Sequence, residues 1–338
     1  MVSRTSISIK AAERSYLASL KREIHSLASS ARFGDRKIGE IDIVVAEIGT
    51  NLVNHGGGGE VLVKLIEEDG HQGIEILALD KGPGMADVSR MMVDGVSTKS
   101  TLGQGLGAIK RLSDYFQVYS QPGWGTVVLS RIFNEPLPSF RKKPAFEIST
   151  LLVPKPNERY CGDGYYAYFD QERLIVFLGD GLGHGVHAEA AVTAAIESLK
   201  ACNSNDSVTM LRHIHESVRK TRGLVATIAI LDIRSRMWNF CGIGNIHSRL
   251  VSHSNHYGYM PYNGIIGMNI PNSLKEREFP YEPGQYLLFC SDGIKSRIDL
   301  NRHTSIQRFD PSIIAAAVYN EFARHTDDTG IVVCKINL

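Results

Sequence analysis

The sequence predicts a mixed α/β protein (α+β in the arrangement of its elements) with two domains, and three observations lead to this expectation. The chain has 338 residues, enough for two separate hydrophobic cores. Stretches with helical spacing of apolar residues and short apolar runs typical of strands both occur along it. Between the halves, residues 134–144 contain three prolines and the basic triplet Arg141-Lys142-Lys143. Because proline disfavours both helix and sheet, we expect domains at 1–133 and 145–338, joined by a semi-rigid linker at 134–144.

The composition argues against two classes of partner. There are 37 basic and 36 acidic side chains, so the formal net charge is +1, which disfavours a dominant electrostatic contact with nucleic acid or an anionic membrane. No apolar run approaches the roughly 20 residues that span a bilayer, and Met1–Lys10 lacks the pattern of a signal peptide. Five cysteines without a Cys-x-x-Cys pair indicate reduced thiols. We therefore expect a cytoplasmic protein with no nucleic-acid or membrane partner.

The first domain is expected to contain a helix that carries two polar residues on one face. Apolar residues recur at helical spacing over Ile38–His55. Glu47 and Asn51 are four residues apart, so they lie on the same side of this helix. A glycine run, Gly56–Gly59, follows it. Two strands are then expected, at Glu60–Ile66 and Gly73–Leu79, and the second leads into Asp80-Lys81-Gly82-Pro83-Gly84.

A second glycine pattern, Gly103-Gln104-Gly105-Leu106-Gly107, opens a helix that we expect at Ala108–Phe116. Taken alone, such a pattern is equally typical of a flexible loop without a ligand and of a phosphate-binding loop. Its place before a helix favours the second interpretation, because free N–H groups and the helix dipole attract an anion there. Trp124-Gly125-Thr126 then precedes a strand expected at Val127–Phe133.

These segments, in this order and at this spacing, resemble the GHKL ATPases, and within them the serine kinase/anti-sigma group. The resemblance covers about residues 5–133 and implies an α/β sandwich that binds ATP. It rests on four segments together: Glu47-x-x-x-Asn51, Asp80-x-Gly82-x-Gly84, Gly103-x-Gly105-x-Gly107 and Gly125-Thr126.

The resemblance implies a role for each position in an ATP site that also takes Mg²⁺. Asn51 would hold the Mg²⁺ that bridges the phosphates, and Asp80 would accept a hydrogen bond from the adenine amino group. Glu47 would be the general base for a Ser or Thr hydroxyl. Lys99 would either reach the terminal phosphate or be a solvated loop lysine. The other nucleotide-binding positions are Thr126 behind Asp80, Gly82 and Gly84 beside the base, and Gly103, Gly105 and Gly107 in the phosphate lid.

The second half contains a series of aspartates beside apolar, strand-like runs. Asp180 follows Leu174–Gly179 in the segment Asp-Gly-Leu-Gly-His-Gly. One Asp-Gly pair is most often a turn, but a series of such aspartates at strand ends can converge, and converging carboxylates repel unless a divalent cation lies between them. Two such cations can activate a water and hold a phosphoryl group. The other members of the series are Asp163, Asp292, and the pair Asp327 and Asp328.

The order of these aspartates resembles the metal-dependent protein phosphatases of type 2C, in their SpoIIE-like branch, over about residues 145–338. This implies a β-sandwich flanked by helices, with two Mg²⁺ or Mn²⁺ ions at one end. Asp180 would bridge the two ions and act in catalysis, and the carbonyl of Gly181 would hold one of them. The remaining ligands would be Asp163 at the second ion, Asp292 and Asp327 at the first, and Asp328 in an outer position that orients a water.

Two positions depart from the phosphatase pattern. Tyr166 stands where the first motif usually has a second carboxylate, and Gly330 stands where the last motif usually has Thr. At the second of these positions, either the neighbouring Thr329 would substitute or the loop would be shifted.

Three hypotheses about the function remain open. In the first, the chain is a bifunctional Ser/Thr kinase and phosphatase that acts on a STAS-type antagonist or scaffold protein. In the second, the first domain is a binding module that sequesters a sigma factor or regulator without phosphate transfer. In the third, the phosphatase domain is degenerate. The sequence leaves the oligomeric state open.

Overall fold

The computed structural model describes residues 5–11, 13–92, 105–138, 143–252, 255–300, 302–303 and 305–338. Contacts divide the chain into two units, Met1–Lys142 with Leu300–Asn320, and Lys143–Asp299 with Glu321–Leu338. The mixed α/β class expected from the sequence is confirmed. The boundary at Lys142 lies inside the expected linker, whereas 300–320 joins the first unit although it lies in the second half of the sequence. Within the described ranges, no helix is long and apolar enough to cross a membrane.

The first unit is built on a five-stranded antiparallel sheet with the order β1-β2-β3-β5-β4. The strands expected near 60, 73 and 127 are present. The helix expected at Ala108–Phe116 is present with other bounds. It starts at Gly105 and ends at Leu112, and the residues from Tyr115 onward form a strand that pairs with β5. The strands are β1 (Ile7–Lys10), β2 (Glu60–Glu68), β3 (His71–Asp80), β4 (Tyr115–Gln121) and β5 (Gly125–Phe133).

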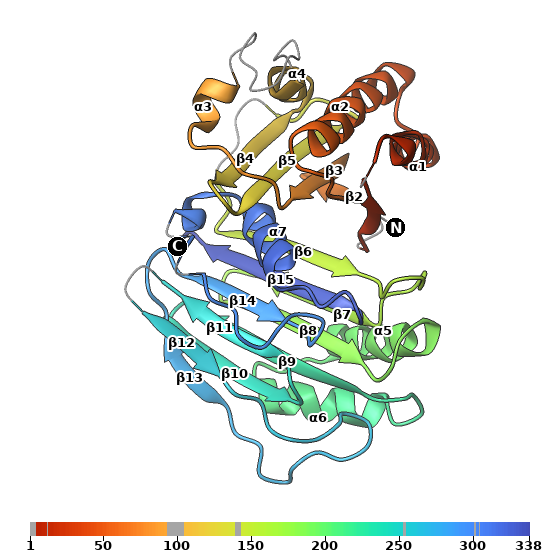
Figure 1. Cartoon of the computed structure of the whole chain (residues 1–338). Coiled ribbons are helices and arrows are strands. Elements are labelled where there is room, and N and C mark those ends of the chain that lie inside the picture. The colour runs from red at the N-terminus through yellow and green to blue at the C-terminus, as the bar shows by residue number, and fades with distance from the viewer. Residues whose placement is uncertain are drawn as a thin grey trace. The chain divides into compact units, whose positions relative to one another are not determined.

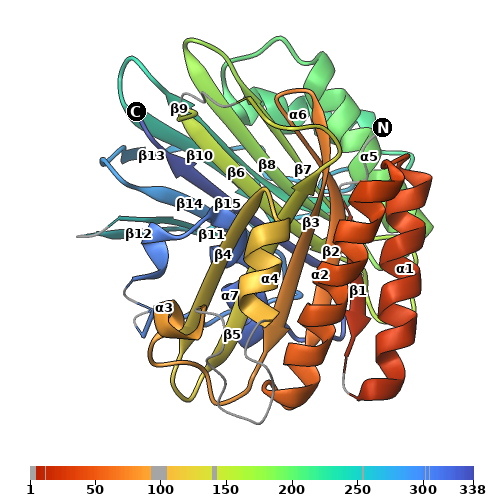
Figure 2. The ribbon, with the colours of Figure 1, turned by 90° about the horizontal axis from the view of Figure 1, so that it is seen from above.

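Helices cover one face of this sheet (Figures 1 and 2). The buried residues of α2 recur at helical spacing from Ile41 to Leu52, as the sequence pattern predicts. They pack with alternate strand residues, such as Val61 and Val63 of β2. The helices of the unit are η1 (Arg14–Tyr16), α1 (Leu17–Ser30), α2 (Asp35–Asn54), α3 (Val88–Met91) and α4 (Gly105–Leu112).

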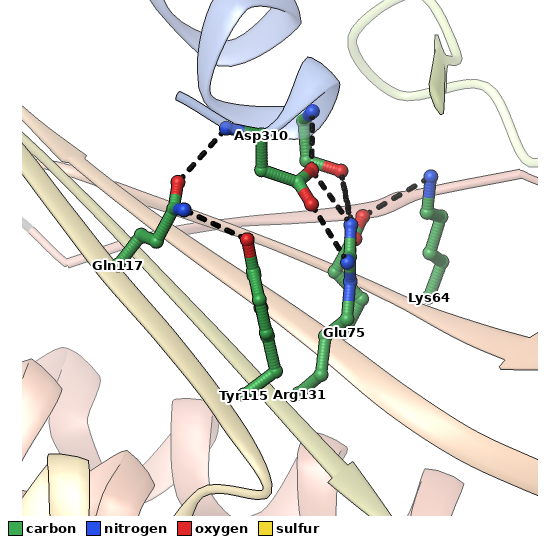
Figure 3. A network of polar contacts seen from close by, with 7 residues as sticks. Lys64, Glu75, Tyr115, Gln117, Arg131 and Asp310 are labelled. Atoms are coloured by element: carbon green, nitrogen blue, oxygen red, sulfur yellow. Dashed lines mark hydrogen bonds and ion pairs between the residues drawn. The ribbon is translucent and has the colours of Figure 1, made fainter. Parts of the chain in front are cut away.

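The opposite face of the sheet is contacted by the segment from the second half of the sequence. This segment contains η2 (Ile306–Arg308) and most of α7 (Pro311–Phe322). Glu75 and Arg131 alternate with residues of the helix-covered face, so their side chains point away from α1 and α2. Both form hydrogen bonds with the hydroxyl of Ser312 at the start of α7, and Figure 3 shows the two side chains beneath that helix.

The second unit contains two five-stranded antiparallel sheets, with the orders β13-β10-β9-β8-β7 and β12-β11-β14-β15-β6. One core cluster contains apolar side chains of both sheets, including Val176 of β8, Phe289 of β14 and Val332 of β15, so the sheets form a β-sandwich. A second cluster joins the other face of the first sheet to α5 (Val186–Ala201) and α6 (Ser207–Ser217). The strands are β6 (Phe146–Val153), β7 (Asp163–Phe169), β8 (Arg173–Gly181), β9 (Leu224–Asp232), β10 (Met237–Ile243), β11 (His247–Val251), β12 (His256–Tyr259), β13 (Arg277–Pro280), β14 (Tyr286–Cys290) and β15 (Thr329–Ile336).

Candidate nucleotide and metal sites

The end of α2 and the start of α4 bring Glu47, Asn51 and Gly105 together. A Cβ atom placed on Gly105 would lie 3.0 Å from Oε2 of Glu47 and 3.1 Å from Oδ1 of Asn51. Gly105 is the first residue of α4, where backbone N–H groups have no partner within the helix. The Nδ2 atom of Asn51 is buried without a hydrogen-bond partner in the described structure. These polar groups at a helix N-terminus fit an ion and a phosphate chain.

Asp80 lies at the end of β3, closely surrounded by glycines. Its Oδ1 atom accepts a hydrogen bond of 2.8 Å from the N–H of Gly82. A Cβ atom on Gly56 would lie 2.7 Å from Cβ of Asp80, and one on Gly84, whose φ is +69°, would collide with the backbone of Gln121. Glycine therefore permits the close approach of these backbone segments.

The Asp80 carboxyl is perturbed by its surroundings. Burial raises its pKa, and hydrogen bonds from the backbone N–H groups of Gly82 and Thr126 oppose that rise. Thr126 is the partner of Asp80 in the β3–β5 ladder and is buried.

The remaining predicted nucleotide residues are only partly within the described structure. Lys99 and Gly103 lie outside it. Gly107 is buried within α4, one turn or less from its start. The third glycine of the pattern thus belongs to the helix that follows the loop.

In the second unit, Asp163 and Asp180 face each other across the β7–β8 pair. The hydroxyl of Ser291 donates a hydrogen bond of 2.7 Å to Oδ2 of Asp163 and accepts one of 2.8 Å from the N–H of Gly330. The Oδ1 atom of Asp163 is buried and has no hydrogen-bond partner. Ser291 follows β14 and Gly330 lies in β15, so one sheet supports a carboxylate of the other.

This arrangement gives a steric reason for Gly330. A Cβ atom on Gly330 would lie 3.1 Å from both Cβ and Oδ2 of Asp163. A side chain there would press on the carboxylate, which is consistent with the absence of the Thr that related phosphatases have.

The other acidic residues lie in loops that meet at the same end of the sandwich. Gly293, next to Asp292, is so close to the backbone of Asp328 that a Cβ atom would collide with it. Oδ2 of Asp292 accepts a hydrogen bond of 3.1 Å from Asn245. Oδ1 of Asp328 accepts one of 2.8 Å from the N–H of Lys155, and its Oδ2 is buried without a partner.

The carboxylates of this cluster repel one another. Burial, followed by the charges of Asp292, Asp327 and Asp328, raises the pKa of Asp180 to about 8. Burial and then the charge of Asp180 raise the pKa of Asp163 well above its usual range. A divalent cation would relieve such repulsion. Among the described residues, no group of three or more His, Cys, Asp or Glu side chains is arranged so that it could hold a metal ion. The mutual repulsion of the carboxylates and the unpaired oxygens of Asp163 and Asp328 nevertheless fit the predicted ions.

The loop after Asp180 brings in residues that the sequence did not assign to the site. Nδ1 of His184 lies 2.6 Å from Oε1 of Glu158. A Cβ atom on Gly183 would lie 3.0 Å from Nη1 of Arg222. Ser291 stands directly before Asp292 in the sequence, which is a signal for it. Glu158, Arg222 and Asn245 carry no such signal.

Two family models match the chain in separate regions. The model described as histidine kinase-like ATPase domain matches residues 10–131. The model described as stage II sporulation protein E (SpoIIE) matches residues 170–337.

Two characterised proteins of Bacillus subtilis (strain 168) are similar to different parts of the chain. The serine/threonine-protein kinase RsbT is 34% identical over 103 residues, which are 30% of this chain and 77% of RsbT. The phosphoserine phosphatase RsbX is 26% identical over 172 residues, which are 49% of this chain and 86% of RsbX.

Two solved structures are each similar to more than half of the chain. A chain from the bacterial stressosome, a modular system adapted to control secondary messenger signalling, superposes with a TM-score of 0.53 at 26% identity, over 56% of this chain and 100% of its own length. RsbX in complex with magnesium superposes with a TM-score of 0.52 at 21% identity, over 58% of this chain and 98% of its own. The latter shows the shared type 2C phosphatase fold.

Proposed function

Because the chain belongs to the family of the serine/threonine-protein kinase RsbT through its first part and carries a SpoIIE-type phosphatase domain in its second, we propose that it both adds and removes phosphate on Ser or Thr. It is a regulator of the partner-switching type, with a kinase-like ATPase domain and a type 2C phosphatase domain. Its substrate in this proposal is a STAS-type antagonist or scaffold protein. Addition and removal of one phosphate group change binding through charge and hydrogen bonding.

The proposed transfer is supported by the convergence of Glu47 and Asn51 at Gly105. The Glu47 carboxylate accepts the proton of the substrate hydroxyl, which makes the oxygen a better nucleophile. The N-terminus of α4 binds phosphate through its free N–H groups. Asn51 would hold Mg²⁺, and the bound ion would neutralise charge on the phosphates. Asp80 selects adenine by accepting a hydrogen bond from its amino group.

The proposed hydrolysis is supported by the carboxylate cluster. Two Mg²⁺ or Mn²⁺ ions would be held by Asp163, Asp180, Asp292, Asp327 and the carbonyl of Gly181. When bound, such ions lower the pKa of a water and neutralise charge on a phosphoryl group. Asp328, fixed by the N–H of Lys155, orients a water with its second oxygen. Ser291 holds the Asp163 carboxylate in place.

The test uses one full-length chain for both activities. In the first step, the chain is mixed with radiolabelled ATP, Mg²⁺ and a purified STAS protein, and the transfer of label to the STAS protein is measured. In the second step, the labelled STAS protein is separated from ATP and incubated with the chain and Mn²⁺, and the release of label is measured. Glu47→Ala should slow labelling by about 10²–10⁴-fold and leave release unchanged. Asp180→Asn should slow the release of label and leave the rate of labelling unchanged. Normal labelling by Glu47→Ala, or normal release by Asp180→Asn, contradicts the corresponding assignment.

One observation favours a second candidate, an ATP-binding regulatory module with a degenerate phosphatase domain. Tyr166 replaces the second carboxylate of the first motif, which removes one potential ligand. This candidate predicts nucleotide binding without Mn²⁺-dependent hydrolysis of any phosphoserine peptide. Hydrolysis that depends on Asp180 excludes it.

A further inference from the structure

The nucleotide-binding unit contains a layer that comes from the phosphatase half of the sequence. Arg131 of β5 donates two hydrogen bonds to Asp310, of 2.9 and 2.8 Å, and a third of 2.7 Å to Glu75 of β3 (Figure 3). Paired hydrogen bonds between a guanidinium and a carboxylate set both distance and orientation. The start of α7 is therefore held on the sheet in a defined position.

Further contacts fix the segment along its length. Oε1 of Gln117 accepts a hydrogen bond of 2.9 Å from the N–H of Asp310 (Figure 3). Before that point, Nδ1 of His303 lies 2.7 Å from the hydroxyl of Tyr119. Near the other end of α7, the hydroxyl of Tyr319 donates a hydrogen bond of 2.9 Å to Oε1 of Glu60. The segment thus contacts strands from β4 to β2, and α7 is attached near both ends.

The last helical residue assigned to this unit reaches the residue proposed to bind adenine. Nδ2 of Asn320, which is 9% exposed, donates a hydrogen bond of 2.9 Å to the backbone carbonyl of Asp80. The carboxyl group of Asp80 accepts a hydrogen bond from the N–H of Gly82. Asn320 therefore restricts the peptide from which the Asp80 side chain projects.

The chain continues from Asn320 directly into the acidic loops. The carbonyl of Phe322, the last residue of α7, accepts a hydrogen bond of 2.9 Å from the N–H of Lys295, and the N–H of Arg324 donates one of 2.8 Å to the carbonyl of Gly293. The loop that carries Asp292 is thus attached to the end of α7. Asp327 and Asp328 follow a few residues later.

From these contacts we propose that Asn320 is a positioning residue of the nucleotide site, and that α7 couples nucleotide binding to metal binding by the carboxylate cluster. The inference rests on the proposed function. A nucleotide that holds Asp80 also restricts Asn320 and the helix behind it, so the loops at the helix end lose freedom before the ion arrives. By linkage, the ion strengthens nucleotide binding by the same factor.

The first test measures nucleotide affinity of the full chain by calorimetry with a non-hydrolysable ATP analogue and Mg²⁺. Asn320→Asp keeps the shape of the side chain, removes the donor and turns a carboxylate toward the carbonyl of Asp80. Affinity should fall about tenfold. Tyr319→Phe is the matched control, because it removes a neighbouring hydrogen bond of α7 that does not reach Asp80; its affinity should change less than twofold. Equal losses of nucleotide affinity in both variants would mean that α7 contributes only through its general packing on the sheet, and would overturn the positioning role of Asn320.

The second test measures the free Mn²⁺ concentration that half-saturates hydrolysis of p-nitrophenyl phosphate, in a metal buffer, with and without the saturating analogue. The wild type should need at least about fivefold less Mn²⁺ when nucleotide is bound. The shift should fall below twofold in Asn320→Asp and persist in Tyr319→Phe. If Asn320→Asp does not fold, Asn320→Ala replaces it with the same expectation. Bound nucleotide with an unchanged Mn²⁺ requirement overturns the coupling alone, whereas absence of nucleotide binding overturns the proposed ATP site as well.

Discussion

Replacing Glu75 by Gln should strongly destabilise the first unit, because this buried carboxylate lies between two cations that are largely shielded from solvent. Its Oε1 is 3.2 Å from Nζ of Lys64, and its Oε2 is 2.7 Å from Nε of Arg131. The Glu75 side chain is 2% exposed, and those of Lys64 and Arg131 are 9% and 15% exposed. Removing one partner of a buried pair leaves an uncompensated charge and costs about 3–5 kcal/mol.

A second route to the magnitude uses the pKa of Glu75. Burial opposes ionisation, but the charges of Lys64 and Arg131, with hydrogen bonds from Arg131 and Ser312, lower the pKa from 4.5 to about 2. Such a difference corresponds to about 3 kcal/mol in the free energy of unfolding. Since the folded-state pKa is depressed, this stability is fully present above pH of about 4.5 and is lost as the pH falls toward 2. Asp310, the other carboxylate on Arg131, remains in both proteins.

The measurement is urea unfolding followed by fluorescence. The chain has two tryptophans, so a shared Trp238→Phe background leaves Trp124 as the reporter of the first unit. Glu75→Gln should lose about 3 kcal/mol at pH 7, and the difference from the parent should shrink between pH 5 and 3. Glu67→Gln, at an exposed position of β2, is the control and should stay within about 0.5 kcal/mol. A loss below about 1 kcal/mol, or one that does not vary with pH, would refute the reasoning.

Three further predictions concern the two sites. Asp80→Asn should weaken ATP binding by about ten- to a hundredfold, since a hydrogen bond to a charged group is worth about 1.5–3 kcal/mol; unchanged affinity by calorimetry in a folded variant would remove Asp80 from the site. Asp180→Asn should abolish phosphatase activity at every Mn²⁺ concentration, whereas excess Mn²⁺ should partly rescue Asp292→Asn; a titration in which both variants behave alike would contradict the bridging role of Asp180. Gly330→Thr, which introduces the residue usual in related phosphatases, should lower the melting temperature because its side chain would press on Asp163; a melting scan showing a more stable variant would contradict this.

Several parts of the fold were predictable because they depend on local patterns. The spacing of apolar residues in α2 determines which side of that helix is buried, and hence that Glu47 and Asn51 share the other. The glycines beside Asp80 likewise indicated backbone segments that approach one another closely, and the aspartates at strand ends indicated carboxylates that lie near one another. The predicted end of the helix at Phe116 was wrong. The helix ends at Leu112, because pairing of β4 with β5 outweighed the helical pattern of the residues that follow.

The sequence by itself determined the two kinds of domain and the order of their motifs, and it predicted most of the polar residues of the two candidate sites, because these follow from spacing along the chain. Only the tertiary structure decided that the segment Leu300–Asn320, which contains most of α7, packs on the sheet of the first unit. Ile313 to Val318 are apolar on every side of α7, so no periodicity indicates a partner for the helix. Its position depends on polar pairs between residues distant in the sequence, Arg131 with Asp310 and Asn320 with Asp80. Such pairs form only when folding brings the two segments together, because the burial that strengthens them does not exist in the extended chain.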